Sequence, residues 1–113
     1  MDAHIRKVYV PMTETSFYIL LFLQKERHGY QIVKEVEKLT NGEIVITPGT
    51  LYGSLSKMEK DRLIVFVREE QKRKIYVITN LGREVLDLEI RRIKRVYKNV
   101  LEVMSDENTK EGF

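Results

Sequence analysis

Apolar residues follow a helical period in four segments of the chain, and two short β-prone runs lie between the third and fourth of these. The pattern predicts helices at about 13–26, 30–40, 48–60 and 80–104, with strands at 63–68 and 74–78. A loop over 69–73 joins the strands, a short arm covers 1–12, and a polar, frayed tail covers 105–113. We therefore expect a mostly α fold of the α+β class, in which a β-hairpin follows three helices.

The first predicted helix is apolar on nearly every face between Phe17 and Leu23. Such a helix has to be buried on more than one side. In a small domain its second side would meet another subunit, although it could also serve as the central core helix of a monomer. The apolar run of seven residues is too short to cross a bilayer.

The second predicted helix has a one-sided apolar pattern and a marked end. Its buried stripe is formed by Ile32, Val33, Val36 and Leu39. Asn41-Gly42 should end the helix, because both residue types tolerate positive φ. The short β-prone run Ile44-Val45-Ile46 then leads into the third helix.

Two faces separate along the third predicted helix. Thr47 suits the N-cap and Pro48 the first helical position. Leu51, Leu55 and Met58 fall on one side and form a core face. Short, non-acidic residues, which suit a helix laid in a DNA major groove, fall on another side: Thr47, Thr50, Ser54 and Lys57. An ordinary amphipathic surface helix would show the same pattern.

The predicted hairpin carries three consecutive basic residues, Lys72, Arg73 and Lys74, at its tip and return strand. A basic ribbon beside a groove-sized helix can bind phosphates, and the order of elements is that of a winged helix-turn-helix DNA reader. Lysines on an edge strand can also serve only to prevent aggregation between sheets. The acidic Glu69 and Glu70 in the same loop fit that alternative.

Thr79 is the expected N-cap of the last helix. Apolar residues repeat along this helix at alternating steps of four and three, as in a heptad seam: Leu86, Ile90, Ile93, Tyr97, Val100 and Met104. A helix of about 25 residues is roughly 37 Å long, which is more than the body of so small a domain requires. We expect the seam to pack against a second copy of the chain, against the first helix, or against both.

Composition narrows the function without deciding it. The chain has 113 residues, 42% hydrophobic and 33% charged, as is typical of one globular domain. The net charge of +3 and the pI of about 9.1 permit a nucleic-acid partner. Cysteine is absent, and His4 and His28 lie far apart with no carboxylate pattern around them, so we expect no disulfide, metal or cofactor. The acidic Asp2 and the lack of a signal-peptide pattern indicate a cytoplasmic protein.

An enzyme is not indicated, because the chain has no glycine-rich phosphate loop, no nucleophile–base pair and no paired carboxylates. The main alternative to a DNA-binding regulator is a winged-helix module that binds another protein. Binding to DNA would weaken steeply with salt, whereas binding by that module would depend little on it.

Three motifs resemble those of the PadR family of bacterial and archaeal transcriptional regulators. Residues 28–32, HGYQI, resemble the HGYEI opening of the family's second helix. Residues 47–59, TPGTLYGSLSKME, resemble its S-x-GTLYPAL-x-RLE recognition helix, and residues 73–82, RKIYVITNLG, resemble its RKYYRIT-x-x-G wing exit. The motifs keep the family's order and spacing over roughly 12–85, and the single helix after the wing resembles the short branch of the family.

The sequence departs from the family pattern at a few positions. Gly53 stands where the family usually has proline, and Ile75 replaces the first aromatic residue of the wing pair. Arg62 stands where the family usually has glycine, so it must accept positive φ or end the helix in another way. The wing loop also lacks the common glycine.

The resemblance implies a homodimeric repressor that binds a palindromic operator in double-stranded DNA. Residues 1–79 would form the winged-helix DNA-binding domain with its N-terminal helix, and 80–113 the long C-terminal dimerisation helix and tail, in one compact unit. The expected DNA contacts are Tyr30, Thr47, Gly49, Thr50, Tyr52, Ser54, Lys57, Lys72, Arg73, Lys74 and Tyr76. The expected dimer contacts are Phe17, Leu21, Leu86, Ile90, Ile93, Tyr97, Val100 and Met104.

Members of the short branch take flat aromatic compounds into a pocket at the dimer interface, which implies a small aromatic effector here. Its expected lining is Tyr18, Phe22, Ile93 and Tyr97. The chain has no tryptophan, so the stacking pair of one type of member is absent. An aromatic stripe at helical spacing is also typical of an ordinary core.

Overall fold

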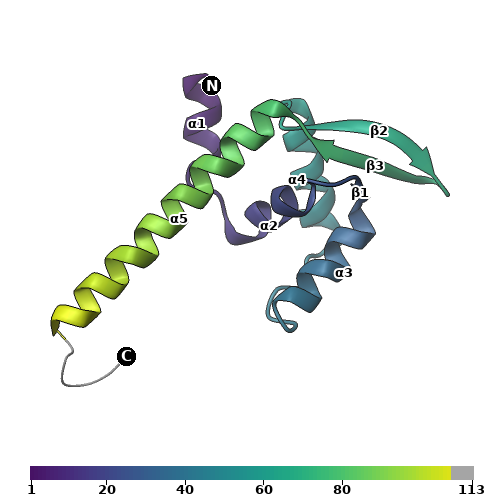
Figure 1. Ribbon diagram of the computed structural model, residues 1–113. Coiled ribbons are helices and arrows are strands. Elements are labelled where there is room, and N and C mark those ends of the chain that lie inside the picture. Colours follow the sequence, from purple (N-terminus) through teal and green to yellow (C-terminus); the bar gives the residue numbers. More distant parts are fainter. Residues whose placement is uncertain (108–113) are drawn as a thin grey trace.

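The computed structural model, which describes residues 1–107, contains every predicted helix and strand in the expected order, with one helix and one strand added. The elements are α1 (Ala3–Tyr9), α2 (Glu14–Phe22), β1 (Arg27–His28), α3 (Gly29–Leu39), α4 (Pro48–Lys60), β2 (Ile64–Glu70), β3 (Arg73–Ile78) and α5 (Asn80–Glu107). The β2–β3 hairpin, called the wing from here on, and α5 project from opposite ends of the helical body (Figure 1). The winged helix-turn-helix with a long C-terminal helix is confirmed.

Residues 3–9 form a helix, so the prediction of an arm over 1–12 was wrong. Asp2 caps this helix, because its carboxylate accepts the backbone N–H of Ile5 at 2.9 Å. Ile5 and Tyr9 are buried, and the Tyr9 hydroxyl donates to Asp61 at the end of α4 at 2.6 Å. With only seven residues, α1 is too short to show a convincing helical period in the sequence.

The limits of α2 and α3 differ from the prediction at two places. Thr13 caps α2 as expected, but the helix ends at Phe22 and not near Glu26. Residues 23–26 instead lead from the helix into the short strand β1, whose Arg27 pairs with Tyr76 of β3. In α3, Leu39 is 55% exposed, so its place in the buried stripe was wrong. It is the last residue of the helix, just before the turn at Asn41-Gly42, both of which have positive φ as predicted.

The sheet has the strand order β1-β3-β2, and both pairs are antiparallel. Because β1 and β2 occupy both edges of β3, the β-prone run Ile44–Ile46 finds no partner there and is not a strand. The predicted loop over 69–73 was too long, since Glu70 pairs with Arg73 and only Gln71 and Lys72 remain between the strands. These two residues have φ of 50° and 63°, as in a type I′ turn, although neither is glycine.

The junction between α4, the wing and α5 is tightly built. Arg62 takes φ of 66° and ends α4 in a Schellman motif, with the Leu63 N–H donating to the Met58 carbonyl at 2.8 Å. This is how the chain manages without the glycine that the PadR family usually has there. Thr79 caps α5 as predicted, and a Cβ at Gly82 would lie 2.1 Å from the Leu63 carbonyl oxygen, so only glycine fits.

The core lies between α1, α2, α3, α4, the sheet and the first turns of α5. Ile19, Leu20 and Leu23 of the α2 region are fully buried, as are Ile32 and Val36 of α3. The predicted core face of α4 is confirmed by the burial of all three of its residues, Leu51, Leu55 and Met58.

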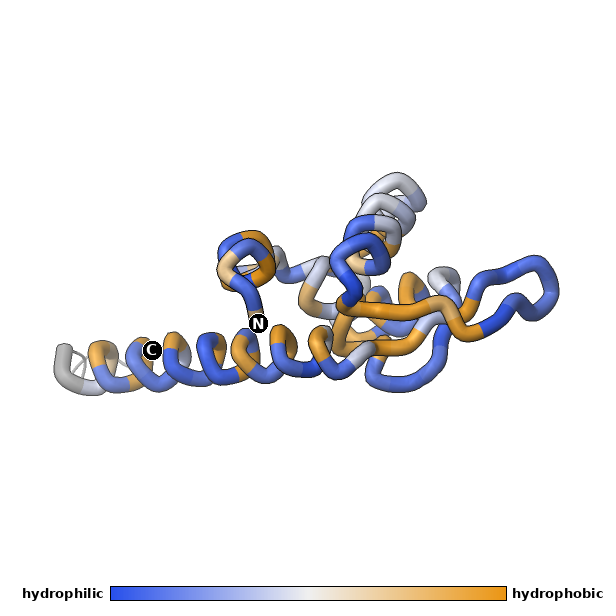
Figure 2. Tube along the Cα trace, turned by 90° about the horizontal axis from the view of Figure 1, so that it is seen from above, coloured by the Kyte–Doolittle hydropathy of each residue, from blue (hydrophilic) through white to orange (hydrophobic). Residues whose placement is uncertain are grey.

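Helix α5 continues to Glu107, so 105–107 are helical and not part of a frayed tail; the rest of the expected tail, 108–113, lies outside the described residues. Its 28 residues make it about 42 Å long. Hydrophobic bands recur along its whole length, beyond the part that touches the body (Figure 2). Between residues 1 and 107, no helix has the length and apolarity needed to cross a membrane.

Glu89 is a buried acid that the sequence pattern did not predict. Its side chain is fully buried where α5 passes the start of α2. It accepts the Met12 backbone N–H at 2.5 Å and the Arg92 guanidinium at 2.6 Å, so the carboxylate is paired and hydrogen-bonded. These bonds connect the segment before α2 to α5.

Candidate nucleic-acid interface

The exposed side of α4 carries small and basic residues. Counting from the core face at 3.6 residues per turn, Gly49, Gly53, Ser56 and Lys60 fall opposite it, with Lys57 beside them. All five are exposed. A Cβ placed on Gly49 or Gly53 would meet nothing within 4 Å, so no packing within this chain requires glycine there. Gly53 lies in the helix interior, where glycine is about 0.5–1 kcal/mol less stable than alanine. The missing side chains leave room for close approach by something outside the chain.

The start of α4 is built by two threonines. The Thr47 hydroxyl accepts the Thr50 backbone N–H at 3.3 Å and donates to the Thr50 hydroxyl at 3.1 Å. Both residues are exposed at the helix N-terminus, where the helix dipole and free N–H groups favour an anion. Ser54, predicted on the same face, is half-buried and turned toward α1, where it lines a small cavity with Tyr9 and Pro11.

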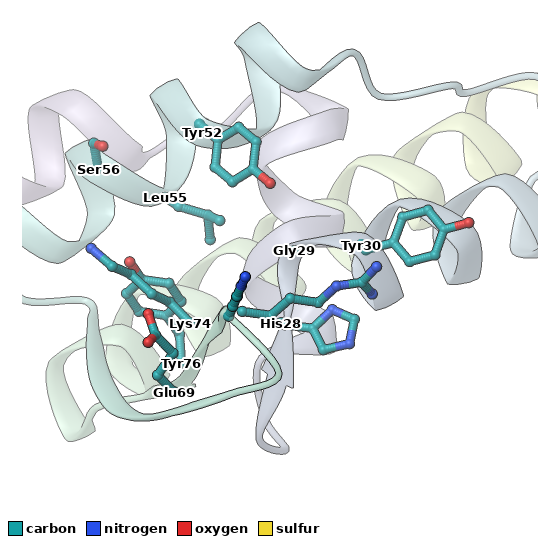
Figure 3. Close-up of a pocket in the computed structure, with 11 residues that line it drawn as sticks. His28, Gly29, Tyr30, Tyr52, Leu55, Ser56, Glu69, Lys74 and Tyr76 are labelled. Atoms are coloured by element: carbon teal, nitrogen blue, oxygen red, sulfur yellow. The ribbon is translucent and has the colours of Figure 1, made fainter.

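A hollow of about 500 Å³ separates α4 from the wing. Its lining combines aromatic and basic side chains with a few others, and it comes from the start of α3 with the preceding His28, from α4 and from the wing: His28, Gly29, Tyr30, Tyr52, Leu55, Ser56, Glu69, Lys72, Arg73, Lys74 and Tyr76. Tyr30 and His28 lie at one end, Lys74, Tyr76 and Glu69 at the other, and Tyr52, Leu55 and Ser56 along the α4 side (Figure 3). The hollow brings together six of the predicted DNA-binding residues from three regions of the sequence, namely α3, α4 and the wing.

Two residues that line the hollow differ from what the sequence predicted. Tyr76 was predicted to contact DNA, yet it is only 8% exposed and packs edge-on against Phe66, so most of its ring belongs to the core. Ser56 also lines the hollow, although the prediction assigned it to neither face of α4. The signal was its spacing of seven residues from Gly49, which repeats the position two turns later.

The charges of the wing are partly balanced. Residues 68–74 contain four basic and two acidic side chains. Arg68 binds both Glu70 at 2.7 Å and Glu26 at 2.5 Å, which ties the wing to the segment before β1. Glu69 lies opposite Lys74 in the strand register. Lys72 and Arg73 form no ion pair in the part of the chain that the structure describes.

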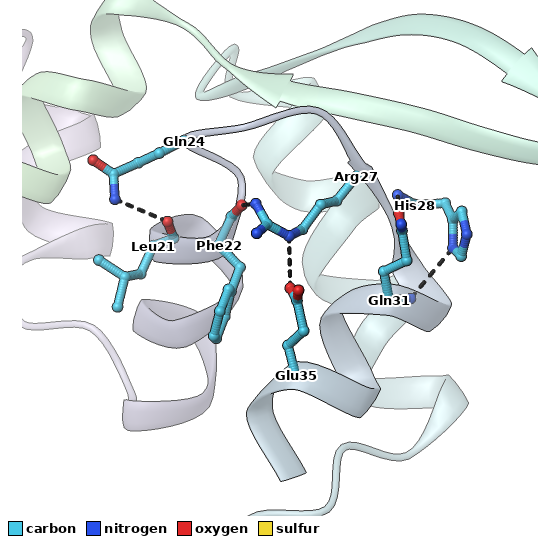
Figure 4. A network of polar contacts seen from close by, with 7 residues as sticks. All are labelled: Leu21, Phe22, Gln24, Arg27, His28, Gln31 and Glu35. Atoms are coloured by element: carbon cyan, nitrogen blue, oxygen red, sulfur yellow. Dashed lines mark hydrogen bonds and ion pairs between the residues drawn. The ribbon is translucent and has the colours of Figure 1, made fainter. Parts of the chain in front are cut away.

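His28 holds the start of α3 in a capping box. Its Nδ1 accepts the Gln31 backbone N–H at 3.3 Å, while the Gln31 side chain accepts the His28 backbone N–H at 3.0 Å (Figure 4). Since Nδ1 is an acceptor, the neutral ring carries its proton on Nε2. Burial, together with the nearby positive charge of Arg73, lowers the pKa of His28, while Glu70 opposes the shift.

Acidification should therefore destabilise the fold through His28. A histidine whose pKa is lowered on folding adds stability above its unfolded value of 6.5, and that stability is lost as the pH falls from 6.5 toward the folded value. Replacing His28 with asparagine, whose amide oxygen caps a helix at any of these pH values, should flatten this dependence. Urea midpoints measured between neutral and mildly acidic pH test this. Parallel curves for the parent and His28→Asn would contradict it.

A second, apolar surface lies on the outer half of α5. Ile93, Tyr97 and Val100 of the predicted dimer interface are 40%, 64% and 38% exposed. Phe17, Leu21, Ile90 and Met104 are half-buried. Leu86 is only 1% exposed and belongs to the core of its own chain, so it is not available to a partner.

The residues expected to line an effector pocket do not all meet. Tyr18 and Ile93 share a cavity of about 400 Å³ with Met12, Glu14, Phe17, Glu89 and Arg92. Phe22 lies elsewhere, with the Arg27 guanidinium 5.4 Å from its ring centroid, and Tyr97 does not line the cavity. Within residues 1–107, no three histidine, aspartate or glutamate side chains are grouped as a metal site would need.

Comparison with known proteins points to one family. The Transcriptional regulator PadR-like family matches residues 19–88. An uncharacterized protein of Lysinibacillus sphaericus is 37% identical over 75 residues, which are 63% of this chain and 69% of that protein. The transcriptional regulator YqjI of Escherichia coli is 32% identical over 75 residues, covering 66% of this chain but only 36% of its own length.

Solved structures agree with this result. A PadR family transcription regulator from Clostridium difficile has a TM-score of 0.64 and 27% identity, covering 83% of this chain and 97% of that one. A transcriptional regulator from Clostridium thermocellum has a TM-score of 0.69 at 23% identity, covering 90% and 96%, and shows the same fold. The family match extends from α2 to α5 through α4 and the wing, so the chain belongs to the PadR-like family of transcriptional regulators.

Proposed function

We propose that this protein is a homodimeric transcriptional repressor that binds a palindromic operator in double-stranded DNA in the cytoplasm. The observation that carries this proposal is the pairing of two features on one side of the molecule. At Gly49, Gly53 and Ser56, the exposed strip of α4 has no large side chain that would hold the helix away from a groove, and Lys57 and Lys60 add positive charge to the strip. The basic, aromatic hollow between α4 and the wing lies directly beside it.

The two elements have different tasks in this proposal. The N-terminal part of α4 enters the major groove, where Thr47, Gly49 and Thr50 approach base edges most closely. Lys57 follows on the same side, and its ammonium lies 5.5 Å from the Tyr9 ring centroid, so α1 helps to orient it. The wing and the Tyr52 hydroxyl bind phosphates, which fix the register without reading sequence.

Dimerisation would use the exposed half of α5. The apolar residues of this half spread over a wide arc and not a single narrow seam: Ile93, Val96, Tyr97, Val100, Leu101, Val103 and Met104. At 100° per residue the arc is about 160° wide, more than one partner helix covers. A second copy supplies two helices, its own α5 and the apolar face of α2 that includes Phe17 and Leu21. The two α4 helices would then read half-sites about 34 Å apart.

The wing residues give the direct test of DNA binding. Lys72→Ala and Arg73→Ala should each weaken binding to operator and to mixed-sequence duplex alike. Each should also flatten the slope of log K against log salt by about 0.9 for every phosphate that the variant no longer neutralises. Fluorescence anisotropy at several salt concentrations measures both quantities. Lys98→Ala, which removes the same charge on α5 away from the wing, is the matched control.

The same titration separates this proposal from a module that binds another protein. A parent protein whose binding to duplex DNA is absent or insensitive to salt would favour the protein-binding alternative. An unchanged slope in both wing variants, with salt-sensitive binding in the parent, would remove only the wing from the interface.

A small aromatic effector would enter beside Tyr18 and Ile93. That cavity lies where α2 meets α5, at the edge of the proposed dimer interface, and contains the paired charges of Glu89 and Arg92. An effector there would change how the two chains pack, and through them the spacing of the two α4 helices.

A further inference from the structure

Tyr30 contacts two positive charges from different elements. The Arg73 guanidinium of the wing lies 4.7 Å from the Tyr30 ring centroid, and the Lys34 ammonium, one turn along α3, lies 4.9 Å from it. Both distances are within the range of a cation–π interaction. The His28 ring adds a nearly parallel contact at 6.5 Å.

In the described part of the chain, the charges of the two cations are not neutralised by direct ion pairs. Neither Arg73 nor Lys34 forms an ion pair with any carboxylate of the described residues. Glu70, which lies opposite Arg73 in the strand register, is instead bound by Arg68 at 2.7 Å. Two cations around one ring, neither of them in an ion pair within that part of the chain, leave a local positive field that an anion would stabilise.

The ring is also a link between the wing and the helical body. The pairing of β1 with β3 ends at His28 and Ile75, so the outer part of the wing, with Arg73, extends past the last paired residue of β1. Tyr30 comes two residues after His28, in the first turn of α3, and its ring is 49% exposed. The Tyr30 ring, on α3, therefore contacts Arg73 just beyond the point where β1 stops pairing with β3.

We propose that Tyr30 is a positioning residue, whose ring holds Arg73 and Lys34 together as one site for backbone phosphates. This inference rests on the proposed DNA binding and deepens it in two ways. It adds Lys34, whose helix face shows only a mixture of charges in the sequence, to the DNA interface. It also assigns the role of Tyr30 to its ring and not to a hydrogen bond from its hydroxyl.

The test compares the ring with the hydroxyl. Tyr30→Leu should weaken binding to a mixed-sequence duplex about threefold to tenfold and flatten its salt slope, because both cations lose the ring. Tyr30→Phe keeps the ring and should restore affinity and slope to within about twofold of the parent. If Tyr30→Phe binds as weakly as Tyr30→Leu, the hydroxyl contacts the phosphate directly and the proposal is wrong.

Two further comparisons make the test specific. In the Tyr30→Leu background, Arg73→Ala should have much less effect than it has in the parent, because Arg73 is no longer positioned; strictly additive effects would overturn the proposal. Lys34→Ala should weaken binding, while Lys38→Ala, one turn further along the same face of α3, should not. Equal effects of the two lysine variants would show a general effect of charge and overturn the shared site.

The outcomes also separate this inference from the proposed function. If the parent protein shows no salt-dependent binding to DNA, the proposed function itself is wrong. If the parent binds DNA, Tyr30→Leu binds it equally well and Arg73→Ala binds it more weakly, only the positioning role of Tyr30 is wrong. Circular dichroism and thermal unfolding of each variant exclude loss of fold, which is not expected at so exposed a ring.

Discussion

Thr50→Glu is expected to lose operator binding by at least about a hundredfold, because a carboxylate facing the phosphate-lined groove is repelled by several kcal/mol. The substitution leaves the core face of α4 unchanged, since Thr50 is exposed. It should not harm the helix either. Thr50 is the third helical residue after the Thr47 cap, and glutamate at that position completes a capping box. The variant should therefore unfold at the same temperature as the parent or higher.

This combination of lost binding and intact stability makes the measurement decisive. Anisotropy titration and footprinting on operator DNA give the affinity, and light scattering gives the mass. Ser105→Glu, which adds the same charge at an exposed position of α5, is the matched control and should bind operator normally. Operator binding by Thr50→Glu at the strength of the parent would mean that α4 does not read the DNA.

Ile93→Asp is expected to convert the dimer into monomers. Ile93 is 40% exposed in the single chain, so the fold tolerates aspartate there, but a partner's helices would bury the charge without a counter-ion. Burial of an isoleucine side chain stabilises by about 1.5–3 kcal/mol. Because the dimer is two-fold symmetric, this contribution is lost once in each chain. Operator affinity should fall with the dimer, because a monomer binds one half-site.

The control for this variant removes one unit of charge without touching the apolar arc. Arg95 lies on the opposite side of α5 and is exposed, so Arg95→Ala makes the same change in net charge. Light scattering over a range of concentrations should show a dimer for Arg95→Ala and a monomer for Ile93→Asp. An undisturbed dimer for Ile93→Asp would exclude this half of α5 from the interface.

Local signals in the sequence were sufficient for most of the fold. The caps Thr47 and Thr79, the stop at Asn41-Gly42 and the core face of α4 each depend on neighbours within one or two turns. The same local signals predicted that the two threonines and the glycine at the start of α4 belong to the DNA-binding site. The three motifs in the sequence also indicated the correct family.

The features that the sequence did not predict share a physical cause, which is that the deciding partner lies far away in sequence. Arg27–His28 is a strand only because β3 offers a free edge, and Ile44–Ile46 is none because that edge is taken. Tyr76 has the sequence signal of a wing contact but is mostly buried in the core. In the sequence, Glu89 resembles the other surface acids of a charged helix. Its burial depends on a hydrogen bond from the Met12 N–H, 77 residues away, which the sequence does not show.

The turn at the tip of the wing combines backbone strain with a positive charge. Gln71 and Lys72 both adopt left-handed backbone conformations, which for residues other than glycine raise the energy by about 1 kcal/mol or more each. An Asn-Gly turn would relieve that strain and is the commonest choice for this geometry. With Lys72 in the turn, the hairpin carries this strain and a cation at its most distal point. The tip is therefore a position where a stabilised variant is easy to design and where its gain would be expected to come with weaker attraction to polyanions.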